Sequence, residues 1–412
     1  GGLETEKAPH PLLAVVDLTR MNQVLEVAEV SHTARVEAGI FGPDLERQLR
    51  ARGFTLGHFP QSFEFSTLGG WVAARSAGQN STFYGKIEEL VLRLRMVTPA
   101  GVVDTGYAVP HACGPDLKPL LVGSEGIYGI LSSATIRLHP LPAAQLYHGF
   151  IFSSFREACE AARLLLQSGL TPGLLRISDE AETASLFALA APSEGFAKKF
   201  SYRAGKLLLA ARRMPVGRSS MVLAGWEGTP DRNWRMKQET LECWRRKFTF
   251  QALGRSVGNS WLQHRFFLPY LRDELLDQGL LVDTWETAAP WSLLAALHAA
   301  VREAVGRACQ SQQVPWDLYA HVSHLYREGA SLYFTLIARQ QPGREMEQWR
   351  EIKEAASRAI LWEQAPISHH HGVGLDHKPY LAESLSPLAR EALLDLKRRF
   401  DPNNLMNPGK VL

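Results

Sequence analysis

In the first third of the chain, apolar and polar residues alternate in two stretches. The alternation runs from Val91 to Val97, is interrupted by a Thr-Pro-Ala-Gly turn, and resumes at Val102. This pattern predicts a β-hairpin over about 91–104, because successive side chains of a strand point to opposite faces. Ile130 to Leu138 alternates in the same way and predicts a further strand.

A helix is expected from Gly42 to Leu49. Pro43 fits the first helical turn, and the carboxylate of Asp44 fits the positive end of the helix dipole. Leu12 to Asp17 is expected to be an interior strand, since it is mostly apolar. The segment His139-Pro140-Leu141-Pro142 ends the strand before it and is expected to mark a domain boundary.

Beyond this boundary, longer helical periods alternate loosely with strands. One long helix is expected to be capped by Asp231 and to carry Trp234, Leu241, Trp244 and Phe248 on one face. The other expected helices lie at about 155–168, 180–189, 261–278, 291–310, 344–360 and 385–399, and the expected strands at about 173–177, 221–226, 316–324 and 331–338. No glycine-rich phosphate loop follows a strand, so we predict an α+β fold rather than a doubly wound nucleotide-binding sheet.

Composition narrows the class of protein. The chain has 412 residues, of which 45% are hydrophobic and 21% charged, which is typical of a globular protein of two domains and excludes disordered and fibrous chains. The 45 Lys and Arg residues against 42 Asp and Glu residues leave a net charge of +3. This excess is too small to indicate binding to nucleic acid.

The cysteines and the apolar runs bear on the cellular compartment. The cysteines lie far apart and predict small buried side chains in a reducing compartment, not disulfides or a zinc site; they are Cys113, Cys159, Cys243 and Cys309. No apolar run reaches the roughly 18 to 20 residues of a membrane-spanning helix, and no signal-peptide pattern opens the chain. These features predict a cytoplasmic protein. Because the chain begins with Gly1 and not Met, its N-terminus is expected to be incomplete.

Two glycine-rich segments have the pattern of a backbone that comes close to a ligand. Gly69 and Gly70 precede a short helical stretch, where N–H groups and the positive helix end attract an anion such as a cofactor phosphate. The segment from Gly123 to Gly129 enters a strand and is suited to setting backbone against a flat ring. For either grouping alone, a tight turn without a ligand is the more common explanation.

Three consecutive histidines, His369, His370 and His371, precede Gly-Val-Gly. Neighbouring side chains point in different directions, so at least one imidazole is expected to face a cleft, where it can move protons or stabilise an anion. A metal site that includes His321 and His324 is an alternative, although adjacent histidines rarely bind one metal together. An exposed cluster without a role is the third interpretation.

The segment 196–218 mixes basic and apolar residues and contains no acid. Its cations are Lys198, Lys199, Arg203, Lys206, Arg212, Arg213 and Arg218, and its apolar residues include Phe196, Phe200 and Leu207 to Leu209. Such a mixture suits the surface of an anionic membrane. A solvated helix beside a buried leucine strip fits the sequence equally well.

Three further residues have no distinctive local context. Tyr333 lies in an alternating strand, where a tyrosine is ordinarily part of the core. Arg176 and Arg272 are ordinarily expected to be partners in surface salt bridges.

Taken in order from about residue 14 to the end, several motifs resemble the alkyldihydroxyacetonephosphate synthase family. These are flavoenzymes of ether-lipid synthesis with the vanillyl-alcohol-oxidase type of FAD fold. The motifs are Val36-Glu-Ala-Gly-Ile, Leu45-Glu-Arg-Gln-Leu, Glu64-Phe-Ser-Thr-Leu-Gly-Gly-Trp, Tyr84-Gly-Lys-Ile-Glu-Glu-Leu-Val, Gly123-Ser-Glu-Gly, Glu286-Thr-Ala-Ala-Pro-Trp and Ser368-His-His-His-Gly-Val-Gly. The last two are specific to this branch, whereas the glycine motifs are shared across the superfamily.

The resemblance implies three parts. They are the remainder of an FAD-binding domain (1–142), a cap or substrate domain with an antiparallel sheet and flanking helices (143–375), and a C-terminal helical segment that returns to the flavin site (376–412). The FAD domain is expected to be truncated at its N-terminus, with Gly1 and Gly2 as a remnant of its pyrophosphate loop. The resemblance also implies a homodimer, and it places a lipid-facing region at 196–218, which favours contact with a membrane surface.

The implied reaction involves no net redox change. A fatty alcohol replaces the acyl chain of acyl-dihydroxyacetone phosphate through a covalent adduct to N5 of FAD. By motif, Tyr333 corresponds to a tyrosine that moves protons at the substrate, and Arg176 to an arginine that activity requires. Arg272 corresponds to an arginine near the substrate phosphate, and Thr284 is assigned to the substrate as well. His369, His370 and His371 correspond to the active-site triplet. The residues assigned to FAD are Pro60, Ser66, Thr67, Gly69, Gly70, Arg75, Ser76, Gly78, Tyr84, Gly85, Glu125, Gly126, Gly129 and Ile130.

Two other functions fit parts of the sequence. The segment Asp401 to Lys410 is more typical of the superfamily's 2-hydroxyacid dehydrogenases, so an FAD-linked D-lactate or glycolate dehydrogenase is the main alternative. Those enzymes usually carry Glu-His-Gly where this chain has His-His-His-Gly, and the active-site motif therefore favours the synthase. A flavin-free binding or scaffold protein is the third possibility.

Overall fold

The computed structural model describes residues 13–190, 196–267 and 270–412, without the side chains of 196–201 and 203. These residues form two compact units. Unit 1 contains the described residues up to Gly78 together with Tyr84–Leu141 and Ile367–Leu412, and unit 2 contains Gln79–Phe83 and Pro142–Pro366. One division falls between Leu141 and Pro142, within the proline-rich segment. Residues 367–375, which the sequence placed in the cap domain, group with unit 1.

Unit 1 is built on an antiparallel five-stranded sheet. Across the sheet, the strands are β1 (Val24–Ala28), β2 (Thr33–Glu37), β6 (Ile130–Arg137), β4 (Val91–Thr98) and β5 (Gly101–Asp104). β4 and β5 form the predicted hairpin, with Met96 opposite Val103 and Val97 opposite Val102. The alternation is explained by burial, because Leu94 and Met96 lie in the core while Arg93 and Arg95 are exposed.

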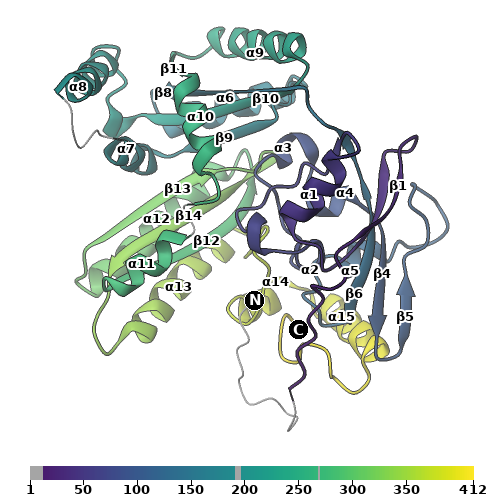
Figure 1. Cartoon of the computed structure of the whole chain (residues 1–412). Coiled ribbons are helices and arrows are strands. Elements are labelled where there is room, and N and C mark those ends of the chain that lie inside the picture. Colours follow the sequence, from purple (N-terminus) through teal and green to yellow (C-terminus); the bar gives the residue numbers. More distant parts are fainter. Residues whose placement is uncertain (1–12, 191–195, 268–269) are drawn as a thin grey trace. The chain divides into compact units, whose positions relative to one another are not determined.

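Most helices of unit 1 bury one or more apolar residues. The predicted helix is confirmed as α1 (Gly42–Arg50), which has proline in its first turn and buries Leu45 and Leu49. The others are α2 (Leu68–Ala73), α4 (Ile87–Leu90), α5 (Lys118–Leu121), α14 (Lys378–Ser384) and α15 (Pro387–Phe400), while α3 (Ser81–Tyr84) belongs to unit 2 except for Tyr84. In Figure 1, α15 (yellow) lies beside the strands of this sheet, where the carbonyl of Phe400 accepts the N–H of Ala100 at 3.1 Å.

Two expectations for this unit are wrong. Leu13 to Asp17 has no regular secondary structure, and its apolar side chains are exposed because no described strand pairs with it; Leu12 lies outside the described residues. Cys113 is also exposed, whereas Cys159 and Cys309 are buried as expected and Cys243 is half-buried.

Unit 2 is built on an antiparallel seven-stranded sheet. Across the sheet, the strands are β11 (Phe250–Gly254), β8 (Ala144–Phe152), β10 (Ser220–Gly228), β9 (Leu174–Ser178), β13 (Trp316–Val322), β14 (Gly329–Arg339) and β12 (Leu280–Pro290). The periodicity missed β8, β11 and β12. From Tyr147 to Phe152, β8 is buried at every position, so its sequence does not alternate.

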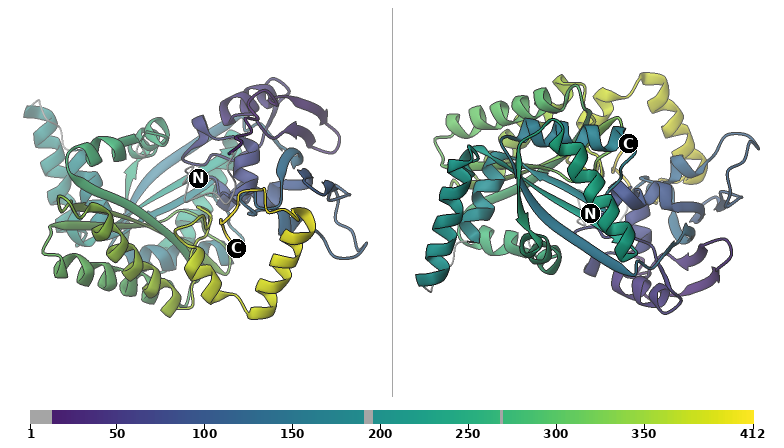
Figure 2. Two further views of the ribbon diagram at one scale, coloured as in Figure 1. Left: turned by 90° about the horizontal axis from the view of Figure 1, so that it is seen from below. Right: turned by 90° about the horizontal axis from the view of Figure 1, so that it is seen from above.

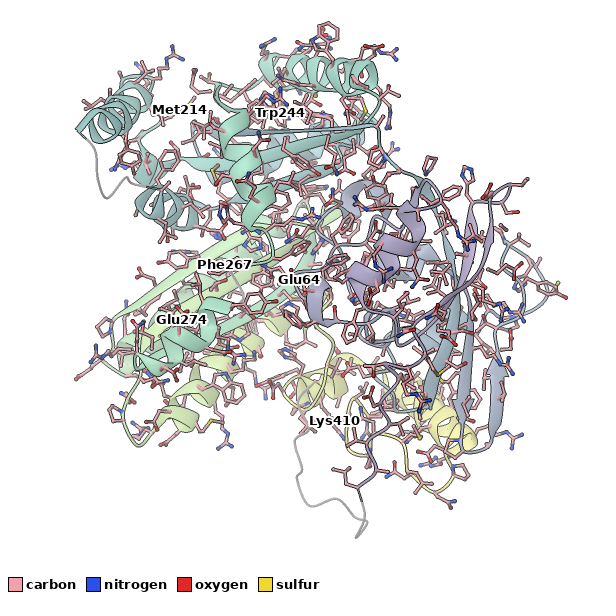
Figure 3. The ribbon with its side chains drawn as sticks, viewed as in Figure 1. Glu64, Met214, Trp244, Phe267, Glu274 and Lys410 are labelled. Carbon is pink, nitrogen blue, oxygen red and sulfur yellow. The ribbon has the colours of Figure 1, made fainter. Side chains whose placement is uncertain are left out.

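Helices flank this sheet. They are α6 (Phe155–Gln167), α7 (Glu180–Leu189), α8 (Phe196–Ala211), α9 (Pro230–Arg245), α10 (Arg255–His264), α11 (Leu271–Asp277), α12 (Leu294–Ser311) and α13 (Glu345–Trp362). α12 and α13 pack side by side (Figure 2). α6 packs against α9, where the buried indole N–H of Trp244, labelled in Figure 3, donates to the carbonyl of Ala161 at 3.2 Å. The predicted α+β fold, with an antiparallel sheet and flanking helices in this unit, is therefore confirmed.

Details of two predicted helices differ. Thr229, not Asp231, caps α9, because its hydroxyl accepts the N–H of Arg232. Trp234, in the first turns of that helix, is exposed, whereas Trp244 is buried. The helix expected at 261–278 is two helices, α10 and α11, and the sequence carries a proline, a poor helix former, at 269 between them.

Candidate functional site

In unit 1, Glu125 holds the loop that carries the three histidines. Its carboxylate accepts the main-chain N–H groups of Val373 and, at 2.9 Å, of Gly374. The carbonyl of Glu125 in turn accepts the side-chain N–H of Asn407 at 2.6 Å. The Gly123–Gly126 motif, the histidine motif and the C-terminal segment therefore meet at one residue.

The three imidazoles lie edge to face along this loop. The Nδ1 atoms of His369 and His370 are 3.0 Å apart, and the rings of His370 and His371 are 4.6 Å apart with an interplanar angle of 66°. His371 is exposed and the other two are half-buried. The ammonium group of Lys86 donates to the carbonyl of His369 at 3.1 Å, which fixes the start of the triplet.

A fourth histidine, His58, is buried in the same unit. Its Nε2 lies 2.9 Å from the hydroxyl of Ser76, and its ring centroid lies 5.0 Å from that of Trp71. Burial, with His370 and Lys86 adding smaller effects, lowers the pKa of His58 to about 3, so its imidazole is neutral. No sequence signal marks His58, because a lone histidine between Gly57 and Phe59 has no characteristic spacing to other polar residues.

The two glycines expected to bind an anion have partners within the chain. The N–H of Gly69 donates to the carbonyl of Ala38 at 2.7 Å, and a Cβ at Gly69 would lie 2.9 Å from that residue. The N–H of Gly70 donates to the hydroxyl of Thr67 at 3.2 Å, which caps α2. Close packing therefore accounts for Gly69, and helix capping engages the N–H of Gly70, while the contact of both glycines with a flavin stays a prediction.

The other residues assigned to FAD lie on loops and element ends of unit 1. They are Pro60, Ser66, Arg75, Ser76, Gly78, Tyr84, Gly85, Gly126, Gly129 and Ile130. Several already have roles in the chain: the hydroxyl of Ser66 accepts the indole N–H of Trp71 at 2.6 Å, and Arg75 donates to the carbonyl of Val122 at 3.0 Å. A Cβ at Gly78 would lie 2.6 Å from the nitrogen of Phe59. Their contact with a flavin stays a prediction.

Unit 2 carries a row of polar side chains on one face of its sheet. Tyr333 on β14 is paired with His321 on β13 and with Glu286 on β12. His321 is paired in turn with Ser178 on β9, two residues after Arg176. Directly paired residues of antiparallel strands share a face, so the row crosses four neighbouring strands.

His321 lies at the centre of this row. Its ring is stacked on that of Tyr333, with centroids 4.8 Å apart and planes 14° apart. Its Nδ1 is 2.9 Å from a carboxylate oxygen of Glu182 and 3.1 Å from the guanidinium of Arg176. Arg176 also pairs with Glu182 at 2.8 Å, and both side chains are largely buried. The default expectation of a surface salt bridge is therefore wrong for Arg176.

The electrostatics of the row follow from this burial. Burial alone would raise the pKa of the Glu182 carboxyl, but Arg176 and His321 outweigh it and hold the value at about 2. Burial and then Arg176 lower the pKa of His321, and Glu182 offsets this in part. Burial raises the pKa of the Tyr333 phenol, while a hydrogen bond with Thr284 opposes the rise. The structure thus brings Arg176, Thr284 and Tyr333 together.

Comparisons with known proteins agree with the two-unit architecture. The family of FAD binding domains matches residues 13–106, and the family of FAD linked oxidases, C-terminal domain, matches residues 141–411. Alkyldihydroxyacetonephosphate synthase of Trypanosoma brucei brucei is 33% identical over 417 residues, covering 100% of this chain and 67% of that protein. The chain belongs to the alkyldihydroxyacetonephosphate synthase family.

Other members of the synthase family give the same result. The synthase of Dictyostelium discoideum is 34% identical over 96% of this chain and 65% of its own length. A solved alkyldihydroxyacetonephosphate synthase structure superposes with a TM-score of 0.78 at 32% identity, covering 96% of this chain and 68% of that one. Glycolate oxidase subunit GlcD of Bacillus subtilis is less similar, at 24% identity. The chain spans about two thirds of the length of the synthases that it matches.

The predicted cofactor, FAD, is the cofactor of this family. Unit 1 offers polar atoms that fit it. Among the described residues, the buried Nδ1 of His58 and the buried hydroxyl of Ser124 have no hydrogen-bond partner. His58 lies two residues before Pro60, and Ser124 directly before Glu125, in the two loops that the motifs assign to the cofactor. A Cβ at Gly126 would approach only the Cβ of Asn407, at 4.0 Å, so there is space beside this backbone. Gly1 and Gly2, the expected remnant of a pyrophosphate loop, lie outside the described residues.

Arg272, which the motifs assign to the substrate phosphate, has a different environment from that of Arg176. Arg272 is exposed in the first turn of α11 and forms no salt bridge with the residues that the structure describes. Thr284, by contrast, follows Asp283 on β12. The carboxylate of Asp283 accepts hydrogen bonds from the ammonium group of Lys353 at 3.0 Å and from the indole N–H of Trp349 at 2.9 Å. These hydrogen bonds fix the strand next to Thr284, whereas the exposed guanidinium of Arg272 is accessible to an anion.

The basic segment 196–218 is α8 and the turn that follows it. The described side chains show Leu207 and Leu208 exposed, at 71% and 54%, whereas Leu209 is buried with Met214 and Val216. The interpretation as a buried leucine strip is therefore wrong for two of the three leucines. Phe196, Lys198, Lys199, Phe200 and Arg203 lie outside the described side chains. No helix of the described residues combines the length and the apolar character needed to span a bilayer.

Proposed function

We propose that this chain catalyses the exchange of the acyl chain of acyl-dihydroxyacetone phosphate for a fatty alcohol. The observation that carries the proposal is Tyr333, stacked on His321 and bonded to Thr284 on one sheet face, in a chain of the synthase family. A tyrosine fixed in this way is suited to moving a proton at one carbon of a bound substrate.

The exchange balances without an external oxidant or reductant. The bond between C1 of the dihydroxyacetone phosphate and the acyl oxygen breaks, and C1 forms a bond to the oxygen of the alcohol. The products are alkyl-dihydroxyacetone phosphate and a fatty acid. When bound, FAD supplies the electron-accepting ring system that makes substitution at C1 possible.

The side chains of unit 2 have distinct parts in this proposal. The raised pKa of Tyr333 keeps the phenol protonated in the resting protein. In the exchange, its oxygen would give this proton to the departing carboxylate and take one from C1, then return that proton to C1 after the alcohol has added and take up the proton of the alcohol. Arg272 presents an exposed guanidinium, whose planar donors match two phosphate oxygens. Thr284 orients the phenol of Tyr333 through their hydrogen bond.

The histidine triplet belongs to the FAD-binding unit. We assign His369, His370 and His371 to proton transfer there, because imidazoles exchange protons near neutrality and the loop is held at both ends by Lys86 and Glu125.

Contact with a membrane surface is part of the proposal. The substrate and the alcohol both carry long apolar chains. The exposed leucines of α8, followed by Arg212, Arg213 and Arg218, suit a surface of anionic lipid. We also propose a homodimer, which sedimentation of the purified protein would test.

The test uses the purified chain with FAD, acyl-dihydroxyacetone phosphate and a labelled long-chain alcohol. We expect a labelled ether product and one released fatty acid per turnover. If no ether forms but D-lactate or glycolate bleaches the flavin absorbance, the chain is an FAD-linked 2-hydroxyacid dehydrogenase. If the protein shows no flavin absorbance after incubation with FAD, a binding or scaffold role is favoured over both enzymes.

A further inference from the structure

His321 links a buried ion pair to Tyr333. On one side its Nδ1 is 2.9 Å from Glu182, which Arg176 binds at 2.8 Å. On the other side its ring covers the ring of Tyr333. None of the sequence motifs singles out Glu182, and the sequence pattern suggests His321 only as an alternative metal ligand.

The contacts determine how the imidazole is held. A carboxylate can only accept hydrogen bonds, and it lies closer to Nδ1 than the guanidinium does, so we assign the ring proton to Nδ1. The hydrogen bond to Glu182 then fixes the plane of the imidazole. Because the two rings are nearly parallel, the plane of the imidazole also restricts the phenol ring.

We propose that His321 is a positioning residue for Tyr333, and that Arg176 acts on Tyr333 through Glu182 and His321 and not by contact with the substrate. Only the catalytic role of Tyr333 in this inference rests on the proposed function. The guanidinium of Arg176 is engaged with Glu182, which is the observation that places its effect on Tyr333 at one remove.

Separately from the path through His321, the charges of this cluster act directly on Tyr333, and this effect does not depend on the reaction. Among the described residues, the charged and titratable groups that act on Tyr333 are Arg176 on β9, its neighbour His321 on β13, and Glu286 and, from the other face of β12, Asp283, while Glu182 of α7 and Asp179 act on His321. Arg176 lowers the pKa of Tyr333, and Glu182 neutralises part of that charge. Removing Glu182 should therefore lower the pKa of Tyr333, and removing Arg176 should raise it.

The first experiment measures this pKa in the purified protein labelled with 13Cζ-tyrosine. The Tyr333 signal is identified by its loss in Tyr333→Phe. We expect Glu182→Gln and Arg176→Met to shift the pKa in opposite directions by about one unit. In the double variant Glu182→Gln/Arg176→Met, which buries no unpaired charge, the pKa of Tyr333 should return close to the wild-type value. This variant keeps the test valid if Arg176→Met does not fold.

A matched control is available elsewhere in the same sheet. His148 on β8 is stacked on Phe150, with centroids 6.1 Å apart, and its Nε2 lies 3.4 Å from Lys237. His148→Phe should leave the pKa of Tyr333 unchanged. Shifts in the same direction, or no shift in either single variant, would overturn the link between Arg176 and Tyr333.

The second experiment uses the exchange assay. His321→Phe keeps a ring beside Tyr333 but removes the hydrogen bond to Glu182. We expect Arg176→Met to lower kcat at least about tenfold in the wild-type background, with little change in KM, and to have no further effect in His321→Phe. An equal loss in both backgrounds would show that Arg176 acts independently of His321. If wild type makes no ether but the opposite pKa shifts occur, the proposed function fails while the link among these residues stands.

Discussion

The carboxylate of Glu125 accepts the main-chain N–H of Gly374 at 2.9 Å, although 249 positions separate them in the chain. The same carboxylate accepts the N–H of Val373, so one side chain satisfies two consecutive amides directly after the histidine triplet. Charge-assisted hydrogen bonds of this kind fix a loop firmly. The conformation of the histidine loop therefore depends on a residue of a different motif.

Gly372→Ala should destabilise this arrangement. Gly372 has a φ of 86°, and a Cβ there would lie 2.8 Å from a carboxylate oxygen of Glu125. We expect a loss of about 2–4 kcal/mol in the free energy of unfolding, from backbone strain and a displaced carboxylate. Gly374→Ala is the control, because Gly374 also has a positive φ, 56°, but open space around it. Urea unfolding of both variants measures the difference, and equal losses would contradict the contact with Glu125.

Tyr333→Phe should abolish the exchange while FAD stays bound. The substitution removes only the phenol oxygen, which carries the proton in the proposed reaction, and leaves the stacked ring in place. We expect kcat to fall by about 10²–10⁴-fold, with unchanged flavin absorbance. Tyr319→Phe, two residues from His321 on β13, is the matched control and should retain activity. Activity retained in Tyr333→Phe would show that another group moves the proton.

Arg212→Glu/Arg213→Glu should weaken binding to anionic vesicles. The two arginines follow the exposed leucines of α8, and their reversal replaces attraction to lipid headgroups by repulsion. We expect at least about a tenfold loss in affinity for vesicles with phosphatidylserine at low salt, measured by co-sedimentation. Arg398→Glu/Arg399→Glu in α15 makes the same change in net charge elsewhere and should have a smaller effect. Equal losses would mean that net charge, and not this segment, drives binding.

The stability of the protein should depend on His58 below neutral pH. Burial lowers its pKa in the folded state to about 3, below the ordinary value of 6.5, so the unfolded state binds one more proton between these values. The contribution of His58 is therefore complete above pH 6.5 and is lost as the pH falls toward 3. Between pH 7 and 5 the loss is about 2 kcal/mol.

His58→Gln should make the pH dependence of unfolding shallower by that amount. The measurement is the free energy of urea unfolding at pH 7 and pH 5 for wild type and variant. His264→Gln, at an exposed histidine of α10, is the control. An unchanged difference between the two pH values in His58→Gln would contradict the lowered pKa.

Local sequence patterns predicted the helices and strands that have one buried and one exposed face. The hairpin of β4 and β5 and the helix α1 were predictable, because each has one buried and one exposed face and clear turn or capping residues. β8 was not predictable in this way, because the sheet and its helices bury it on both faces. The apolar segment before Asp17 shows the opposite error, because its sequence predicted a strand that its described residues do not form. Leu13 and Val15 have no strand to pair with among the described residues and remain exposed.

The candidate site likewise has features that the sequence predicted and features that only the fold decided. The sequence by itself determined the family and the cofactor, and it predicted Tyr333 and the histidine triplet as site residues, because motifs carry residue types and order. Only the tertiary structure decided that Arg176 is engaged by Glu182, that His321 stacks on Tyr333, and that Glu125 holds the loop after His371. The physical reason is distance along the chain. These contacts join residues that are 6 to 249 positions apart, and their strength depends on burial and on cross-strand register, which no local pattern records.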